Sequence, residues 1–307
     1  MGHETTSKNQ AIRLINYYVI MLVLVFLIFL RVCLCSVVRK IDPTKIDYCE
    51  KTCTVEDPNT NKPSKVYENS ACDCRANTTH TELLFQLVEF RKTMLELHNS
   101  LRNKLALGKV KHKDGSFYPN ASNMRALSYS LEVEYIARCY AVKIYDDHDE
   151  CRDTIKHKAV GQNVHFADSP YEPYTTTMWW WWKQFDVYNP KHIDKYELIQ
   201  GVGEKAYADF TQLAWAEVYT LGCARSWNLG NYKFGRFAVL CNYESMGEGA
   251  NKMGAPVYAQ GPSCSGCPEG TNCNPKYTGL CGRIDQVPMD RPPYIYKRGE
   301  ISTTTES

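Results

Sequence analysis

The sequence predicts a disulfide-stabilised α+β protein, and three observations lead to this fold class. Residues 84–105 and 131–145 repeat apolar side chains at helical spacing, and 221–224 and 234–243 are typical of strands around a glycine-containing turn. Fourteen cysteines in 307 residues favour an oxidising compartment. The formal net charge of +2 gives no sign of the strongly basic face that nucleic-acid-binding domains carry, so no nucleic-acid partner is expected.

The N-terminal residues predict a signal peptide, residues 1–35. The unbroken, mostly aliphatic run Tyr17–Leu30 follows basic residues and has the length of a signal-peptide core, shorter than the roughly 20 residues of a spanning helix. Cys33-Leu34-Cys35 then offers a cleavage point. The alternative is an uncleaved anchor: if Arg31 snorkels, the apolar run extends to Val38 and is long enough to span. Cleavage would leave no stable membrane span and an even set of twelve cysteines in a secreted, extracellular protein.

Residues 36–80 form a cysteine-containing N-terminal extension with too few apolar residues to bury a core of their own. Disulfides are expected to hold it down through Cys49, Cys53, Cys72 and Cys74. Zinc is the competing interpretation, but the cysteine spacings lack the repeated Cys-x2-Cys pairs or histidine partners of a zinc module. Asn77 and Asn120 lie in glycosylation sequons, which carry weight because secretion is predicted independently.

Two helices are predicted from apolar stripes. The first covers 84–105, and Thr79-x-x-Glu82 before it has the form of a capping box. His98 within this stripe is interpreted as a packing or surface hydrogen-bonding residue. The second covers 131–145, where apolar residues recur at four-residue spacing.

Four consecutive tryptophans, Trp179–Trp182, precede a short predicted helix at 183–188. Four adjacent indoles cannot all face one side of a helix, so some are expected to pack inward and at least one to be exposed. An exposed indole is either packed loosely against a neighbouring loop or a contact surface for an apolar partner, and the sequence leaves both interpretations open.

The C-terminal part divides into a small cysteine-rich segment, residues 261–282, and a tail. Two short-loop disulfides are expected among Cys264, Cys267, Cys273 and Cys281. Residues 283–307 are rich in proline and then in serine and threonine, and this composition predicts disorder.

Several motifs occur in the order in which one protein family has them. They are His148-Asp149-x-Cys151-Arg152, Gly161-Gln162-Asn163, Phe210-Thr211-Gln212, Gly222-Cys223-Ala224 and Cys241-Asn242-Tyr243. In combination they resemble the CAP superfamily of cysteine-rich secretory proteins, antigen 5 and plant pathogenesis-related proteins, with the antigen-5-like members as the nearest pattern. The resemblance implies a three-layer α-β-α sandwich at 81–260, and 261–282 resembles the cysteine-rich hinge that follows many such domains.

The resemblance also implies disulfide pairs. They are Cys223 with Cys241, Cys53 with Cys151, and Cys49 with Cys72 or Cys74. This chain has Cys139, whereas the family's helix cysteine falls at Ile144. Five residues rotate a helix by about 140°, so Cys139 reaches the remaining N-terminal cysteine only if that segment follows a different path, and its pairing is left open.

The family's central cleft often holds two histidines and two carboxylates, a set that suits a divalent metal. Carried over position by position, the four residues are His148, Gln162, Gln184 and Asp209. Three of the four are altered, and the two neutral amides are poor ligands, so the cleft is expected to hold no metal tightly. Each glutamine is expected to hydrogen-bond His148, Asp209 or water instead. A close Asp209–His148 contact would favour the charged imidazolium.

Three functions are weighed. A secreted protease or hydrolase needs a nucleophile with a base in reach, and neither a Gly-x-Ser-x-Gly nor a His-Glu-x-x-His motif is present. The protein is therefore predicted not to be an enzyme and to need no cofactor. The favoured function is binding of a sterol or fatty-acid ligand, which the resemblance implies. The alternative is a toxin- or allergen-like effector that acts on an extracellular protein receptor.

Overall fold

The computed structural model describes residues 21–22, 42–55, 65–75, 79–144, 147–197, 208–228, 237–247, 249–293 and 295. The chain divides into two compact units, Met1–Ile41 and Asp42–Ser307, and only the second is described beyond two residues. The predicted signal peptide, Asn77 and most of the predicted disordered tail therefore lie outside the described residues. Asn120 is described and exposed, and its glycosylation stays a prediction. Among the described residues, no helix has the length and apolar character needed to cross a membrane.

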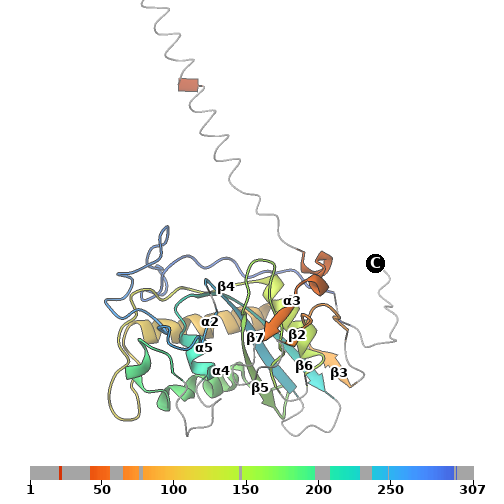
Figure 1. Cartoon of the computed structure of the whole chain (residues 1–307), viewed down its shortest axis with the longest axis horizontal. Helices are drawn as coiled ribbons and strands as arrows, with labels where there is room; N and C mark the ends of the chain where they lie inside the picture. The colour runs from red at the N-terminus through yellow and green to blue at the C-terminus, as the bar shows by residue number, and fades with distance from the viewer. Residues whose placement is uncertain are drawn as a thin grey trace, which may run out of the picture. The chain divides into compact units, whose positions relative to one another are not determined.

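The second unit is built on a sheet with the strand order β3-β6-β7-β5, in which neighbours are antiparallel, while β4 pairs in parallel with β6 (Figure 1). Its strands are β3 (His80–Glu82), β4 (Ser128–Tyr129), β5 (Gly161–Ala167), β6 (Val218–Asn228) and β7 (Phe237–Ser245). The two strands predicted from the sequence lie within or overlap β6 and β7, which pair in the register Cys223↔Cys241. In the N-terminal extension, β1 (Cys53–Val55) and β2 (Lys65–Tyr67) form a separate two-stranded sheet.

Helices cover both faces of the sheet. α2 (Leu87–Ala106), α4 (Tyr174–Trp182) and α5 (Ala208–Ala214) contact one another in one layer, and α3 (Leu131–Ala141) packs on β6 and β7. Alternation along the strands separates the two cores, because Ala224 and Leu240 cluster with α3 whereas their neighbours Cys223 and Cys241 belong to the core of the other layer. The predicted α+β class and three-layer sandwich are confirmed.

Close packing between α3 and β6 depends on Gly222. A Cβ atom at this position would lie 2.1 Å from the backbone nitrogen of Glu134, which no real contact allows. Only glycine therefore lets α3 approach the sheet this closely. The helix itself begins at the N-cap Ser130, whose side chain accepts a hydrogen bond from the backbone N–H of Val133.

The helix ends differ from the predicted ones. α2 begins without a side-chain cap, because the predicted capping box instead contributes β3, and Glu82 forms an ion pair with buried Arg138. α3 ends at Ala141, four residues before the predicted end. The tryptophans themselves form the end of α4, and only the short 3-10 helix η3 (Lys183–Asp186) follows them. Three further 3-10 helices are η1 (Pro43–Lys45), η2 (Tyr48–Glu50) and η4 (Pro190–His192).

Within the described residues, disulfides tie the extension to the domain and close two short loops inside the cysteine-rich segment. The pairs are Cys49–Cys72, Cys53–Cys151, Cys74–Cys139, Cys223–Cys241, Cys264–Cys273 and Cys267–Cys281. They include the pairs that the resemblance implies and the two short loops of the cysteine-rich segment. Cys49 forms its disulfide with Cys72, and Cys74 forms one with Cys139 of α3. The N-terminal extension thus follows the path that a cysteine at position 139 requires.

The described start of the predicted tail, residues 283–293, is ordered against the domain, contrary to the expectation of disorder. Arg91 of α2 donates to the carbonyl oxygen of Pro288 at 2.8 Å, and Arg138 of α3 donates to that of Pro293 at 2.5 Å. We call residues 283–293 the C-terminal strap. The order of the strap could not be predicted from its proline-rich composition, because the contacts use backbone carbonyls, which every residue has.

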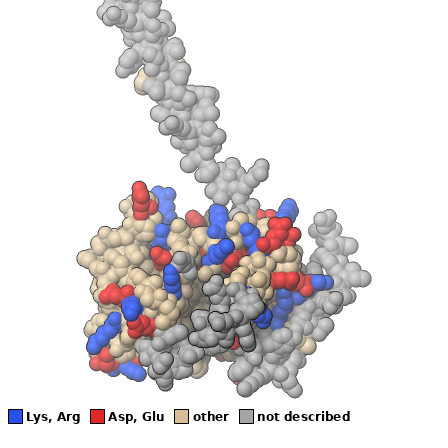
Figure 2. Space-filling view, in the orientation of Figure 1, with Lys and Arg blue, Asp and Glu red and all other residues tan. Residues whose placement is uncertain are grey.

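Charged side chains are mixed in sign on the surface and paired in the interior. On the face that Figure 2 shows, Lys and Arg are interspersed with Asp and Glu rather than gathered by sign. Inside, Arg91 and Glu134 form an ion pair at 2.6 Å with both side chains almost fully buried. Buried Arg102 donates to several backbone carbonyls, among them those of Leu213 and Trp215, and so joins α2 to the end of α5.

Candidate functional site

The first half of the predicted cleft is formed by His148 and Gln162. Gln162 lies on β5 opposite Asn242 of β7, and its Nε2 donates to Oδ1 of Asn242 and to Oδ1 of Asp149, each at 2.9 Å. These two acceptors fix the amide so that its Oε1 faces Nδ1 of His148 at 2.8 Å. His148 is therefore the donor through Nδ1, and in the neutral ring Nε2 carries the lone pair.

The imidazole of His148 is biased toward its neutral form. The surrounding protein desolvates the ring and lowers the pKa of His148; the hydrogen bond that His148 donates to Gln162 opposes this shift, and the cation of Arg152 reinforces it. No hydrogen bond or ion pair joins His148 to Asp209 in the described part of the chain. The contact that would have favoured the imidazolium is thus not made.

The second half of the cleft is formed by Gln184 of η3 and Asp209 in the first turn of α5. Nε2 of Gln184 donates to Oδ2 of Asp209 at 2.8 Å, and its Oε1 accepts the backbone N–H of Phe210 at 3.1 Å. Burial raises the pKa of Asp209 to about 7, and the hydrogen bond from Gln184 opposes this shift. The raised pKa favours the protonated carboxyl of Asp209 relative to an exposed aspartate.

Hydrogen bonds join the four predicted residues in two pairs, His148 with Gln162 and Gln184 with Asp209. Gln162 and Asn163 follow each other on β5 and face opposite sides, so Gln162 meets His148 while Asn163 donates to the backbone carbonyl of Asp209 at 3.1 Å. Each glutamine hydrogen-bonds one of the other two predicted residues, Gln162 with His148 and Gln184 with Asp209, as expected for neutral amides. The amides of both glutamines are thus hydrogen-bonded, whereas Nδ2 of Asn242 is buried without a partner among the described residues.

Asp149 and Asn242 belong to this network and were not among the predicted site residues. Asp149 also accepts from Nε of Arg152 at 2.5 Å, which holds its carboxylate beside Gln162. Both residues lie in motifs that carry the family resemblance, directly beside His148 and Cys241. Adjacency to a named site residue was the signal that could have found them.

The donors of this cleft do not suit a divalent cation. Both glutamine oxygens already accept hydrogen bonds, from His148 and from the backbone of Phe210, and Asp209, whose pKa burial raises, replaces the second histidine. Elsewhere in the described chain, one close cluster of metal-ligating residue types occurs, and it consists of Cys264, Cys267 and Cys281. All three sulfurs are in disulfides, so they provide no thiolate.

An exposed aromatic surface adjoins the second pair. Trp179 and Trp180 are 54% and 43% exposed, whereas the other two tryptophans of α4 are buried, which confirms the expected division. Nζ of Lys183 lies 4.4 Å and 3.4 Å from the ring centroids of Trp179 and Trp180. His165 of β5 stacks on Trp180 at 6.3 Å between centroids. We call Trp179, Trp180 and Lys183 the tryptophan surface; Gln184 of the second pair follows Lys183 in η3.

Comparison with known proteins places the chain in a family. The model of the CAP family, described as the cysteine-rich secretory protein family, matches residues 95–243. A venom allergen 3 homolog of Dinoponera quadriceps is 31% identical over 174 residues, which cover 55% of this chain and 71% of that protein. A cysteine-rich venom protein of Tityus serrulatus is 29% identical over 216 residues, 69% of this chain and 50% of that protein. This chain therefore spans about half the length of that relative.

The solved structure of Na-ASP-1 has the same fold, with a TM-score of 0.51, 23% identity, and coverage of 75% of this chain and 50% of that chain. Fold, motif order and relatives agree in defining a protein of the CAP class. The chain belongs to the cysteine-rich secretory protein family, and its relatives include venom proteins and venom allergens.

Proposed function

We propose that this protein is a secreted, extracellular binding protein without enzymatic activity, and that it binds a sterol or fatty-acid ligand on the tryptophan surface. One observation carries the proposal: the indoles of Trp179 and Trp180 stay exposed, while the amides of Gln162 and Gln184 are already hydrogen-bonded within the protein. Each indole offers a large apolar area that an apolar partner can cover. The ammonium group of Lys183, which lies over the Trp180 ring, suits the polar end of such a ligand.

The cleft supports binding rather than catalysis. Nucleophilic catalysis by a hydroxyl or thiol needs a serine, threonine or cysteine within hydrogen-bond reach of a base. In the described chain no such side chain hydrogen-bonds to His148, and its Nδ1 is engaged by Gln162. The described cysteines are in disulfides, which supports both the absence of a thiol nucleophile and an extracellular location.

The test measures ligand binding and turnover on the same secreted protein. A panel of fluorescent sterols and fatty acids is expected to show saturable binding at micromolar strength, roughly −8 kcal/mol. Replacing both Trp179→Ala and Trp180→Ala should weaken binding about tenfold or more. Trp227→Ala is the matched control, because this indole is also exposed, at 38%, but stacks on Phe237 of β7.

Two outcomes would contradict the proposal. If no member of the panel binds saturably while a sterol-binding relative does, the receptor-directed effector function takes its place. If a peptide library is hydrolysed and His148→Ala abolishes the hydrolysis, the protein is an enzyme.

A further inference from the structure

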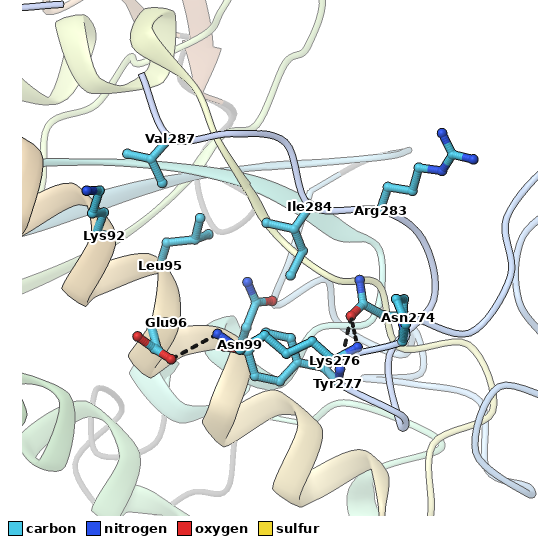
Figure 3. A pocket seen from close by; sticks show the side chains of 11 residues that line it. Lys92, Leu95, Glu96, Asn99, Asn274, Lys276, Tyr277, Arg283, Ile284 and Val287 are labelled. Atoms are coloured by element: carbon cyan, nitrogen blue, oxygen red, sulfur yellow. Dashed lines mark hydrogen bonds and ion pairs between the residues drawn. The ribbon is translucent and has the colours of Figure 1, made fainter. Parts of the chain in front are cut away.

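A second cavity lies apart from the cleft, between α2, the cysteine-rich segment and the start of the C-terminal strap (Figure 3). Its volume is about 630 Å³, within the range of small-molecule sites, roughly 300–1,000 Å³. It shares no lining residue with the tryptophan surface or the four cleft residues. We call it the hinge cavity.

One side of the hinge cavity is apolar. Leu95 of α2 and Tyr277 of the cysteine-rich segment are buried, and Ile284 and Val287 of the strap are partly buried against the same core. These residues come from α2 and from the consecutive cysteine-rich segment and strap, which lie far from α2 in the sequence. The wall therefore exists only because the strap is held against the domain.

The asparagines that line the cavity are already satisfied. Oδ1 of Asn274 accepts the backbone N–H groups of Lys276 and Tyr277, each at 2.9 Å (Figure 3). Asn99 of α2 exchanges two hydrogen bonds with the backbone of Leu127, at 3.0 Å and 2.8 Å. A ligand therefore does not have to supply hydrogen bonds to these amides.

The rim of the hinge cavity is basic. Lys92, Lys276 and Arg283 line it, against one carboxylate, Glu96. Glu96 is bonded to Lys276 at 3.0 Å, whereas Lys92 and Arg283 enter no ion pair within the described chain. In Figure 3 these two residues lie at opposite ends of the group, with the apolar side chains between them.

We propose that the hinge cavity binds a small anionic amphiphile, a carboxylate carried on a hydrocarbon chain. The apolar wall takes the chain, and Lys92 or Arg283 pairs with the carboxylate. An uncharged sterol leaves the cations without a partner, and inorganic phosphate leaves the apolar wall in water. The proposal goes beyond the tryptophan surface and stands on the cavity's own geometry.

Calorimetry on the full secreted protein tests the proposal with dodecanoate and dodecanol, which share a chain and differ in charge. Dodecanoate is expected to bind saturably, and dodecanol about tenfold more weakly. In the Trp179→Ala/Trp180→Ala background, which removes the tryptophan surface as a second fatty-acid site, the double variant Lys92→Glu/Arg283→Glu should weaken dodecanoate binding about tenfold or more. The control Lys113→Glu/Lys191→Glu makes the same change in net charge at exposed lysines that do not line the cavity, and should bind as the parent does.

The proposal is overturned if dodecanoate does not bind saturably, or if both charge-reversed proteins bind it equally. If the Trp179→Ala/Trp180→Ala variant no longer binds dodecanoate and the Lys92→Glu/Arg283→Glu variant still does, the ligand occupies the tryptophan surface. That result supports the proposed function and overturns the proposal that the hinge cavity is a binding site. Hydrogen exchange provides a second measurement, with added protection expected at Tyr277 and along α2. Thermal unfolding of all variants checks that they fold.

Discussion

The cleft and the hinge cavity are both lined by polar side chains, but these are satisfied in different ways. In the cleft, Gln162 and Gln184 close onto His148 and Asp209, and their amides are already hydrogen-bonded inside the protein. In the hinge cavity, Lys92 and Arg283 have no ion-pair partner within the described residues and stand beside an apolar wall. A position carried over from a family therefore does not make a binding site by itself; the groups left without a partner decide what can be bound.

The largest expected effect comes from releasing the strap that walls the hinge cavity. Arg91 donates to both carboxylate oxygens of Glu134 at 2.6 Å and to the carbonyls of Pro288 and Asp290 at 2.8 Å. Arg91→Met leaves Glu134 buried without a counter-charge, so the free energy of unfolding should fall by about 3–5 kcal/mol in urea titrations. The double variant Arg91→Met/Glu134→Leu should recover much of this loss. Equal stability of parent and single variant would contradict this account.

The second prediction concerns the zinc affinity of the cleft after its metal-ligating residues are restored. Gln162→Glu, Gln184→Glu and Asp209→His together restore the family pattern around His148. Two carboxylates and a second imidazole should raise zinc affinity by roughly a hundredfold or more in calorimetry. Sub-micromolar zinc binding by the unmodified protein, abolished by His148→Ala, would show this interpretation of the cleft to be wrong.

A third prediction concerns the pH dependence of stability that Asp209 imposes. Its pKa rises from 3.8 to about 7 on folding, so the folded state binds more protons than the unfolded state between these values. The contribution of Asp209 is thus fully present below about pH 4 and is lost as the pH rises through about 7. Asp209→Asn keeps the acceptor for Gln184 and should gain roughly 1–3 kcal/mol over the parent at pH 8 but not at pH 4.

Urea titrations at these two pH values measure the difference, with Asp168→Asn, at an exposed carboxylate, as the control. An equal gain for Asp209→Asn at both pH values would mean that burial of the charge is not the cause. Such a result would remove the argument that the cleft disfavours an ionised carboxylate.

The smallest expected effect is on the dodecanoate affinity of the hinge cavity. Glu96 is its one carboxylate and pairs with Lys276. Glu96→Gln should free that cation and raise dodecanoate affinity two- to fivefold, roughly the size of one exposed charge interaction. Stability should change little, because both side chains are exposed. A fall in affinity would place the carboxylate of the ligand elsewhere.

Much of the framework follows from local patterns in the sequence. The apolar stripe at 84–105 predicts α2 to within a few residues, and the runs at 221–224 and 234–243 predict the central pair of strands, because burial repeats with the period of the element. The order of the CAP motifs adds the three layers and the Cys223–Cys241 link, which joins facing residues of β6 and β7.

The partner of each polar group was decided by the tertiary structure. Thr79-x-x-Glu82 has the pattern of a capping box, yet Glu82 pairs with Arg138, 56 residues away. A helix cap contributes about 1 kcal/mol, whereas a buried carboxylate without a counter-charge costs more. In the same way, the register of β5 on β7 sets Asn242 beside Gln162. The composition of residues 283–293 predicts disorder, but arginines of α2 and α3 hold these residues by binding their backbone carbonyls. Every residue has a backbone carbonyl, so the sequence pattern does not reveal these contacts.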